Sequence, residues 1–314
     1  MKAYLYMILA ALCLASIGVL VKMIGNAVPP LTLVFFKLFI GFLFLLIVTP
    51  FVSTKFLRVD LVKVEKYFWI GVVYAFAISL YTVANLFAPV QNVVVLHYIY
   101  PFFVLPFAYL LLKERITKTK LITLIIAIIG IAIINPISLD ANMFGNILAL
   151  VSAVVYALLI TEMRSVDRNH SPGSIVWFLF FATILLFPFM LIYGLGNIMS
   201  VLPHLIALGI IGSGLAYLLY SIALEEMEAE SASVISMIIT PLVSIVLAVF
   251  LIGEIIDYRI IIGGVILIFA GIYLETHCQK VKCDEKIETP ITKKEKMFRR
   301  FRRRKTKKTK QKKK

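Results

Sequence analysis

Charged residues are scarce in this 314-residue chain, and their scarcity excludes most soluble folds. They make up 16% of the sequence, whereas apolar residues make up 61%. A water-soluble domain of this size would leave too much apolar surface in contact with water. The composition therefore predicts an integral membrane protein, for which lipid takes the place of water.

Groups that serve catalysis or metal binding are equally few. The three cysteines, Cys13, Cys278 and Cys283, form no C-x-x-C pair and no cluster with zinc spacing, so we expect free thiols and no metal site. No Asp or Glu lies in the middle of a long apolar run, and His97 is the only deeply placed histidine. No phosphate-binding glycine loop is present. These absences argue against an enzyme, an ATP-driven pump and a bound cofactor.

Apolar segments long enough to cross a bilayer recur along the chain. A helix rises 1.5 Å per residue, so about 20 apolar residues cross the ~30 Å hydrocarbon layer. The runs are continuous rather than alternating in polarity, which predicts helices and excludes a barrel. The first run follows Lys2 without a clear cleavage site, so we interpret it as a span and not a signal peptide. The ten predicted spans are 3–25, 31–52, 68–88, 92–112, 119–136, 143–163, 173–193, 201–223, 229–251 and 260–277.

Lys and Arg residues fall on one side of this ten-span arrangement. Because basic loops stay in the cytoplasm, this distribution predicts that both termini are cytoplasmic and that the protein resides in the cell membrane. Arg259 is the only loop cation on the opposite side. The cytoplasmic loop cations are Lys55, Arg58, Lys63, Lys66, Lys113, Arg115, Lys118, Lys120, Arg164 and Arg168.

The net charge of +15 belongs almost entirely to the C-terminal segment. Residues 278–314 hold 18 Lys or Arg and 4 Asp or Glu, a balance of +14. We interpret this segment as a disordered cytoplasmic tail that contacts anionic lipid headgroups, because each basic residue near such a surface contributes about 1 kcal/mol. A tail that is merely solvated is the alternative. Nucleic-acid binding is not expected, because no folded module accompanies the charge.

An internal repeat divides the rest of the chain at about residue 140. At an offset of 140, Pro101 and Glu114 align with Pro241 and Glu254, and an offset of 139 pairs Tyr81 with Tyr220. Five predicted spans precede the division and five follow it, so the second copy enters the membrane from the opposite side. Inverted repeats are typical of secondary transporters with a substrate site between the halves. The sequence predicts an all-α membrane protein of ten transmembrane helices, with repeats at 1–136 and 143–277.

The residues around the repeated Pro and Glu carry a family resemblance. Tyr100-Pro101 followed by Leu111-Leu112-Lys113-Glu114-Arg115 resembles the end of an EamA-type repeat, and Thr240-Pro241 followed by Leu251-Ile252-Gly253-Glu254 resembles its second copy. Lys37 stands where that family often has Arg. The resemblance covers about residues 3–277 and implies the drug/metabolite transporter superfamily, with ten helices and export or exchange of small metabolites. It discriminates substrates poorly.

Polar side chains within the predicted spans form stripes at helical spacing, and we expect these stripes to line a central cavity. Helix packing is the alternative for the Ser and Thr positions. Tyr81 and Tyr220 are the pair we expect to contact a substrate. The predicted pathway residues are Tyr74, Tyr81, Asn85, His97, Tyr100, Tyr156, Ser213, Tyr217, Tyr220, Ser236 and Thr240.

Two cations and two prolines complete the predicted features. Lys37 lies roughly 9 Å from the outer end of its span, where it either snorkels outward or attracts an anionic group. Lys22 is expected at the membrane interface. Pro101 and Pro241 are predicted to kink their helices, either as flexible points or for packing.

The sequence thus favours a secondary exporter or exchanger of small organic metabolites, such as amino acids or amphipathic compounds, which works by alternating access. The alternative within transport is an exchanger of phosphorylated or nucleotide-linked sugars, with Lys22 and Lys37 as anion ligands. A membrane scaffold and a membrane-embedded enzyme are less favoured, and the oligomeric state is left open.

Overall fold

In the computed structural model, every regular element of the described residues is a helix. The described part of the chain comprises residues 2–52, 64–112, 142–166, 172–226, 229–270 and 272–273, together with positions 122, 125–126, 129–130 and 133. Met1–Ile272 form one unit, to which the following description applies, and Tyr273–Lys314 form another. The predicted tail and most of the predicted span 119–136 lie outside the described residues.

The helices follow the predicted apolar runs closely, and their bounds are as follows. The first half contains α1 Lys2–Ile24, η1 Gly25–Ala27, α2 Pro30–Val52, α3 Val64–Phe87, α4 Val90–His97 and α5 Tyr100–Leu112. The second half contains α7 Met143–Val166, α8 Pro172–Tyr193, α9 Ile198–Gly209, the π-helical turn η4 Ile210–Leu215, α10 Ala216–Glu226 and α11 Ala229–Ile252. A shorter apolar helix covers Tyr258–Ala270.

Seven helical segments of the described residues are long and apolar enough to cross a membrane, and the two stretches Ile239–Ile252 and Tyr258–Ala270 are shorter apolar helices. The protein is therefore a multi-pass membrane protein. Helices are the form that satisfies backbone hydrogen bonds in lipid, and hydroxyl groups inside them bond back to the preceding turn. Thr161 and Thr183, for example, each donate to the carbonyl four residues earlier at 2.8 Å.

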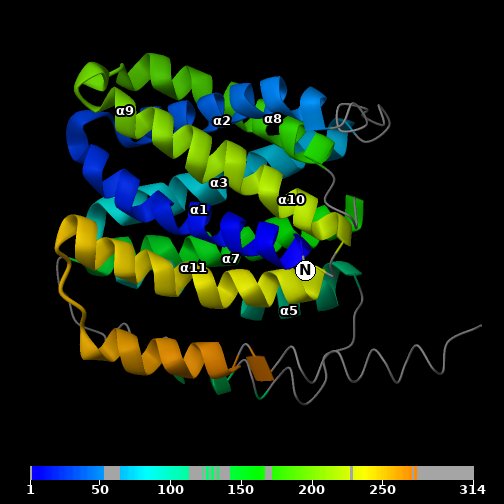
Figure 1. The fold of residues 1–314 in the computed structure, drawn as a ribbon, viewed down its shortest axis with the longest axis vertical. Helices are drawn as coiled ribbons and strands as arrows, with labels where there is room; N and C mark the ends of the chain where they lie inside the picture. The colour runs from blue at the N-terminus through cyan, green and yellow to red at the C-terminus, as the bar shows by residue number, and fades with distance from the viewer. Residues whose placement is uncertain are drawn as a thin grey trace, which may run out of the picture. The chain divides into compact units, whose positions relative to one another are not determined.

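Segments from the two halves of the chain lie side by side throughout the bundle (Figure 1). Helix α3 packs on α7 and α8, while α1 packs on α10 and α11. Helix α2 contacts α8, α9 and η4, and α7 also contacts α4 and α5. Exchanging α1 with α7, α2 with α8, α3 with α9–α10, and α4–α5 with α11 reproduces these contacts. The two halves therefore use equivalent faces to contact each other.

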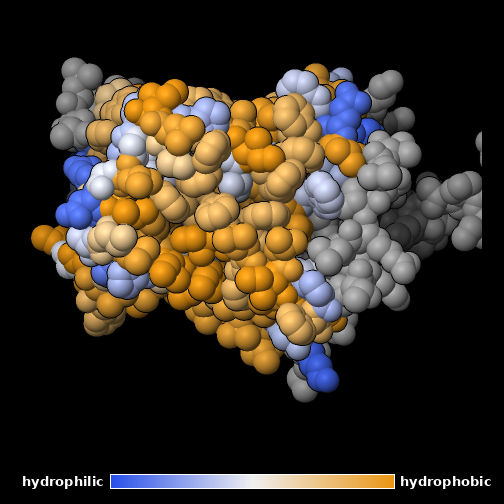
Figure 2. Space-filling view, turned by 90° about the horizontal axis from the view of Figure 1, so that it is seen from above, coloured by the Kyte–Doolittle hydropathy of each residue, from blue (hydrophilic) through white to orange (hydrophobic). Residues whose placement is uncertain are grey.

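An apolar band covers the face of the bundle shown in Figure 2, with hydrophilic residues gathered at its two ends. Large exposed apolar side chains of α8 contribute to the apolar surface of the unit, among them Ile184, Phe187, Leu191 and Ile192. A contiguous surface of this kind marks a membrane contact in a chain of this composition.

The predicted span 92–112 is interrupted, which sequence periodicity did not indicate. Helix α4 ends at His97, and α5 begins at Tyr100 after a turn at Tyr98 and Ile99. Pro101 has no backbone N–H to donate to the carbonyl of His97, so the helical ladder breaks at this point. Helix α11, in contrast, continues through Pro241.

Four connections meet at one end of the bundle. The backbone N–H of Asn197 donates to the carbonyl of Ala27 at 2.7 Å, and the hydroxyl of Thr32 donates to the carbonyl of Gly194 at 2.8 Å. The other two connections are those between α3 and α4 and after α11. They meet near the end of α1, where Glu254 contacts Val90 and Lys22, as described below. The ten predicted spans also place these four connections on the same side of the membrane.

Candidate functional site

A cavity of about 90 Å³ lies between the two halves of the chain, and we call it the tyrosine cavity. Helices α1, α3, α4 and α5 line it from the first half, and α7, α8, α10 and α11 line it from the second. Sites that enclose drug-sized ligands measure ~300–1,000 Å³, so in this conformation the cavity has room only for a small molecule or part of a larger one. Eight predicted pathway residues line it: Tyr74, Tyr81, His97, Tyr100, Tyr156, Tyr217, Tyr220 and Ser236.

His97 stands at the centre of the aromatic wall. Its ring centroid lies 4.4 Å from that of Tyr81, 5.0 Å from Tyr156 and 6.2 Å from Tyr100. Tyr100 and Tyr156 are in turn 4.9 Å apart in an edge-to-face arrangement. Aromatic pairs at such distances add about 0.5–1.5 kcal/mol beyond their buried area, so these contacts stabilise the wall.

A hydrogen bond joins the two halves across the cavity. The hydroxyl of Tyr74 on α3 donates to the hydroxyl of Tyr217 on α10 at 2.9 Å. Phe178 of α8 packs on both rings, with centroids 5.0 Å from Tyr74 and 6.4 Å from Tyr217. The stripe spacing placed both tyrosines on inward faces, but their direct pairing was not predicted.

Three predicted pathway residues do not line this cavity. Asn85 is buried on α3, where its side-chain amide donates to the carbonyl of Tyr81 at 2.9 Å. Ser213 is buried in η4, close to α2: a Cβ atom added at Gly41 would lie 2.6 Å from the Cβ of Ser213. Thr240 is buried on α11, one turn beyond Ser236. Asn85 and Ser213 thus lie at close helix approaches.

Lys37 is fully buried on α2, and its ammonium nitrogen has no hydrogen-bond partner among the described residues. The snorkelled arrangement considered from the sequence is therefore not the one adopted. A buried ammonium without a counter-charge is costly. Lys37 is not among the residues that line the tyrosine cavity.

Tyr98 and Phe178 line the cavity but were missed by sequence reasoning. Tyr98 follows His97 directly, and an unbroken helix would have turned it about 100° away from the inward stripe. Pro101 was the sequence signal that could have indicated a break in the helix, and with it a different direction for the side chain of Tyr98. Phe178 lies in a uniformly apolar run, in which the sequence does not distinguish inward-facing from lipid-facing positions.

Tyr98 also lines a second cavity, of about 200 Å³, between α4, α11 and the helix Tyr258–Ala270. The other residues around that cavity are aliphatic, together with Pro241 and Gly264. It offers a polar substrate almost no hydrogen bonding. Within the described residues, no cluster of three His, Cys, Asp or Glu side chains is placed to hold a metal ion.

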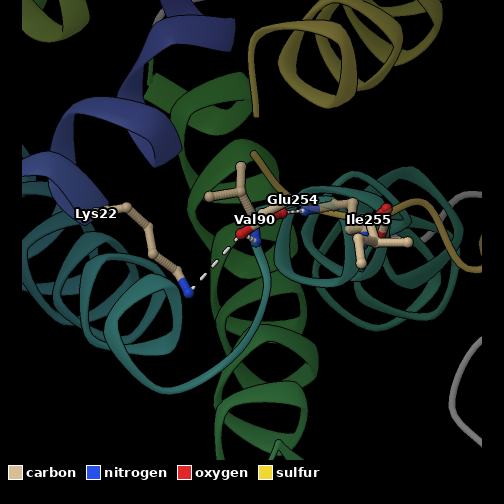
Figure 3. Close-up of polar contacts among 5 residues, drawn as sticks. Lys22, Val90, Glu254 and Ile255 are labelled. Atoms are coloured by element: carbon tan, nitrogen blue, oxygen red, sulfur yellow. Dashed lines mark hydrogen bonds and ion pairs between the residues drawn. The ribbon is translucent and has the colours of Figure 1, made fainter. Parts of the chain in front are cut away.

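A polar contact site at one end of the bundle, which we call the Glu254 junction, is drawn in Figure 3. One carboxylate oxygen of Glu254 accepts a hydrogen bond from the backbone N–H of Val90 at 2.9 Å, and the other accepts from Gln91 at 3.4 Å. The side chain of Gln91 donates to the carbonyl of Ile255 at 2.6 Å. Lys22 of α1 lies 3.8 Å from the same carboxylate.

The sequence explains why Glu254 reaches this place. Gly253 adopts a left-handed conformation (φ +73°) that ends α11, as glycine commonly does after a helix. Helix α4 begins after Pro89, which supplies no side-chain cap, so its first N–H groups need an acceptor. Glu254 therefore caps a helix of the other half, and its negative charge also suits the positive end of the helix dipole. Both effects stabilise the junction.

Comparison with known proteins identifies the family. The sequence profile of the EamA-like transporter family matches residues 1–135 and, a second time, residues 143–276. The chain belongs to the EamA-like transporter family. This agrees with the resemblance of the repeated Pro and Glu motifs.

Similar proteins include two uncharacterized transporters of Archaeoglobus fulgidus. One is 33% identical over 177 residues, which is 55% of this chain and 63% of the relative. The other is 25% identical over 269 residues, or 85% of this chain and 93% of the relative. A pseudopaline exporter of Pseudomonas aeruginosa is 29% identical over 187 residues, covering 58% and 64% of the two chains. The matched region thus spans less than two thirds of several relatives' own length.

The fold itself has a solved counterpart. One crystal structure superimposes with a TM-score of 0.63 at 17% identity, covering 89% of this chain and 98% of that chain. At this level of identity the similarity concerns the fold alone.

Proposed function

We propose that the protein is a secondary transporter, an exporter or exchanger, of small and largely apolar or amphipathic organic metabolites. The carrying observation is that the tyrosine cavity lies between the two halves and receives aromatic side chains from both. Tyrosine offers apolar area and one hydroxyl, which suits a pocket with few polar anchors. The exporter of pseudopaline among the relatives supports a small-metabolite substrate.

Alternating access between two inverted five-helix repeats, 1–136 and 143–277, is the mechanism we propose. The exchange-symmetric packing of α1, α3, α7 and α10 supports it, because equivalent faces allow the halves to rock between equivalent arrangements. In this mechanism the Glu254 junction closes the outer end of the bundle. Opening that end requires the contacts of Val90, Gln91 and Lys22 with Glu254 to separate.

Exchange of phosphorylated or nucleotide-linked sugars remains the second candidate, because Lys37 is a buried ammonium without a partner in the described part of the chain. Lys22, the other cation considered for such a role, lies beside Glu254, which partly neutralises it. The metabolite transporter is therefore favoured.

Substitution of Tyr81 and Tyr220 tests the proposed substrate site. Tyr→Ala at either position should weaken substrate binding by roughly 1–3 kcal/mol through lost contact area and hydrogen bonding. Tyr→Phe should change selectivity only modestly. Uptake of a metabolite panel into proteoliposomes at matched protein levels is the measurement. Unchanged affinity and rate in both folded Tyr→Ala variants would show that these side chains only pack helices.

Cell-membrane residence with both termini in the cytoplasm is also part of the proposal. Single cysteines at Ser138 and Asn197 should react with an impermeant thiol reagent outside intact cells, whereas cysteines at Ser53 and Thr117 should not. The reverse labelling pattern would overturn the orientation.

For the basic tail, binding of its peptide to anionic vesicles should weaken with added salt, which screens charges beyond ~8–10 Å.

A further inference from the structure

His97 presents two ring nitrogens to different surroundings. It is the last residue of α4, its side chain is only 5% exposed, and it lines the tyrosine cavity. Its Nδ1 lies 2.8 Å from Oγ of Ser152 on α7. Its Nε2 has no hydrogen-bond partner within the described residues, and the ring is flanked by Tyr81 and Tyr156.

The hydroxyl of Ser152 determines which nitrogen carries the proton. Its oxygen also lies 2.6 Å from the carbonyl oxygen of Ala149. A carbonyl only accepts, so the single hydroxyl hydrogen of Ser152 is directed to Ala149. The hydrogen in the contact with His97 must then come from Nδ1–H. A neutral imidazole protonated at Nδ1 carries its lone pair on Nε2.

An acceptor is thereby placed in a wall that is otherwise mostly apolar. The cavity also contains the side chains of Leu14, Ile17, Ile78, Leu159 and Ile175. An acceptor that faces a mostly apolar cavity gains a hydrogen bond when a bound molecule supplies an N–H or O–H group. Sites with such a group reject analogues that lack the hydrogen-bonding partner more strongly than apolar pockets reject a change of size.

We propose that Nε2 of His97 is a specificity determinant that selects substrates with an N–H or O–H donor next to an apolar or aromatic body, and that Ser152 positions it. This inference rests on the proposed role of the tyrosine cavity as the substrate site. The donor class comprises phenols, alcohols, amides and amines. Molecules of the same shape without a donor bind more weakly.

Phenol and toluene are matched probes, because they share size and ring and differ in one hydroxyl. Equilibrium dialysis against the detergent-purified full chain gives the ratio of the two affinities, and comparing this ratio between variants cancels partition into detergent. Two variants separate the ring nitrogens. His97→Asn keeps a donor near the Nδ1 position but removes the cavity acceptor, whereas His97→Gln places an amide oxygen near the Nε2 position.

The phenol-to-toluene affinity ratio should fall about three- to tenfold in His97→Asn and by much less in His97→Gln. Size-exclusion profiles and thermal unfolding establish that both variants are folded. An unchanged ratio in folded His97→Asn would overturn the specificity role. If both probes still bound and Tyr81→Ala and Tyr220→Ala weakened both, the cavity would remain the substrate site. If neither phenol nor toluene bound to the unsubstituted protein, the result would count against the cavity as the substrate site and against the role of His97.

The positioning role of Ser152 has its own spectroscopic readout. In ¹⁵N-histidine-labelled protein, the nitrogen shifts of His97 should identify protonated Nδ1 and unprotonated Nε2. Ser152→Ala should redistribute the proton between the two nitrogens, because Nδ1–H loses its acceptor. Ser152→Thr, which retains the hydroxyl, should restore the original shifts. Spectra identical in the original protein and in Ser152→Ala would overturn this role.

Discussion

The tyrosine cavity and the Glu254 junction both join the two halves of the chain, but they do so with different chemistry. The cavity is lined mainly by aromatic rings from both halves, together with the imidazole of His97. At the junction, a carboxylate is committed to backbone N–H groups and a neighbouring ammonium.

This difference suggests that the cavity serves ligand binding, whereas the junction controls the conformation of the bundle. A ring that borders open space can exchange a neighbour for a ligand without disturbing the backbone. A carboxylate that caps a helix cannot leave unless α4 moves away from the end of α11. Substitutions in the cavity should therefore alter ligand affinity, whereas substitutions at the junction should alter the equilibrium between closed and open arrangements.

Glu254→Ala should produce the largest effect at the junction. It removes the acceptor of Val90 and Gln91 and leaves Lys22 without its counter-charge, at a cost of about 2–4 kcal/mol to the closed arrangement. Hydrogen exchange measured by mass spectrometry should speed up in peptides that contain the start of α4. Glu254→Gln, which retains one carbonyl oxygen, is the matched control and should have an intermediate effect. Exchange that did not change in Glu254→Ala would mean that the cap does not hold α4.

Tyr74→Phe should have a smaller effect and leave the junction untouched. The substitution removes the hydrogen bond to Tyr217 but keeps the ring, so we expect a loss of about 0.5–1.5 kcal/mol in stability. A double-mutant cycle with Tyr217→Phe, followed by thermal unfolding in detergent, measures the coupling of the pair. Additive effects would show that the two hydroxyls do not interact. Faster exchange at the start of α4 would break the separation between the two regions.

Lys22→Ala should have the smallest effect. The ion pair is 3.8 Å long and its side chains are 26% and 13% exposed, so it contributes about 0–1 kcal/mol after screening. Hydrogen exchange at the start of α4 should rise only slightly. A change as large as that of Glu254→Ala would show that the charge of Lys22, rather than helix capping, closes the junction.

Sequence reasoning reached the cavity more readily than the junction, for a physical reason. Spacing of three and four residues placed Tyr74 and Tyr81 on one face of a helix, and the repeat offset paired Tyr81 with Tyr220; both members of that pair line the cavity. Periodicity reports the face on which a side chain lies. It contains no information on which helix that face contacts.

The junction depends on information of another kind. In the sequence Glu254 stands out only as a member of the repeated Pro and Glu motif, but its partners are backbone N–H groups, which every residue except proline possesses. Nothing in the local pattern marks Val90 as its partner. Lys37 illustrates the same limit, because its distance along the span did not reveal that the neighbouring helices bury it completely.

The long sequence separation between Glu254 and the helix that it caps also affects when this contact can form during synthesis. Val90 and Glu254 are 164 residues apart. A ribosome that adds about 5–20 residues per second needs roughly 8–30 seconds to cover that distance. For this interval the first N–H groups of α4 have no protein acceptor from Glu254 and depend on water at the membrane edge. Closure of this end of the bundle is therefore a late event in biogenesis, and a chain arrested before residue 254 would retain an uncapped α4.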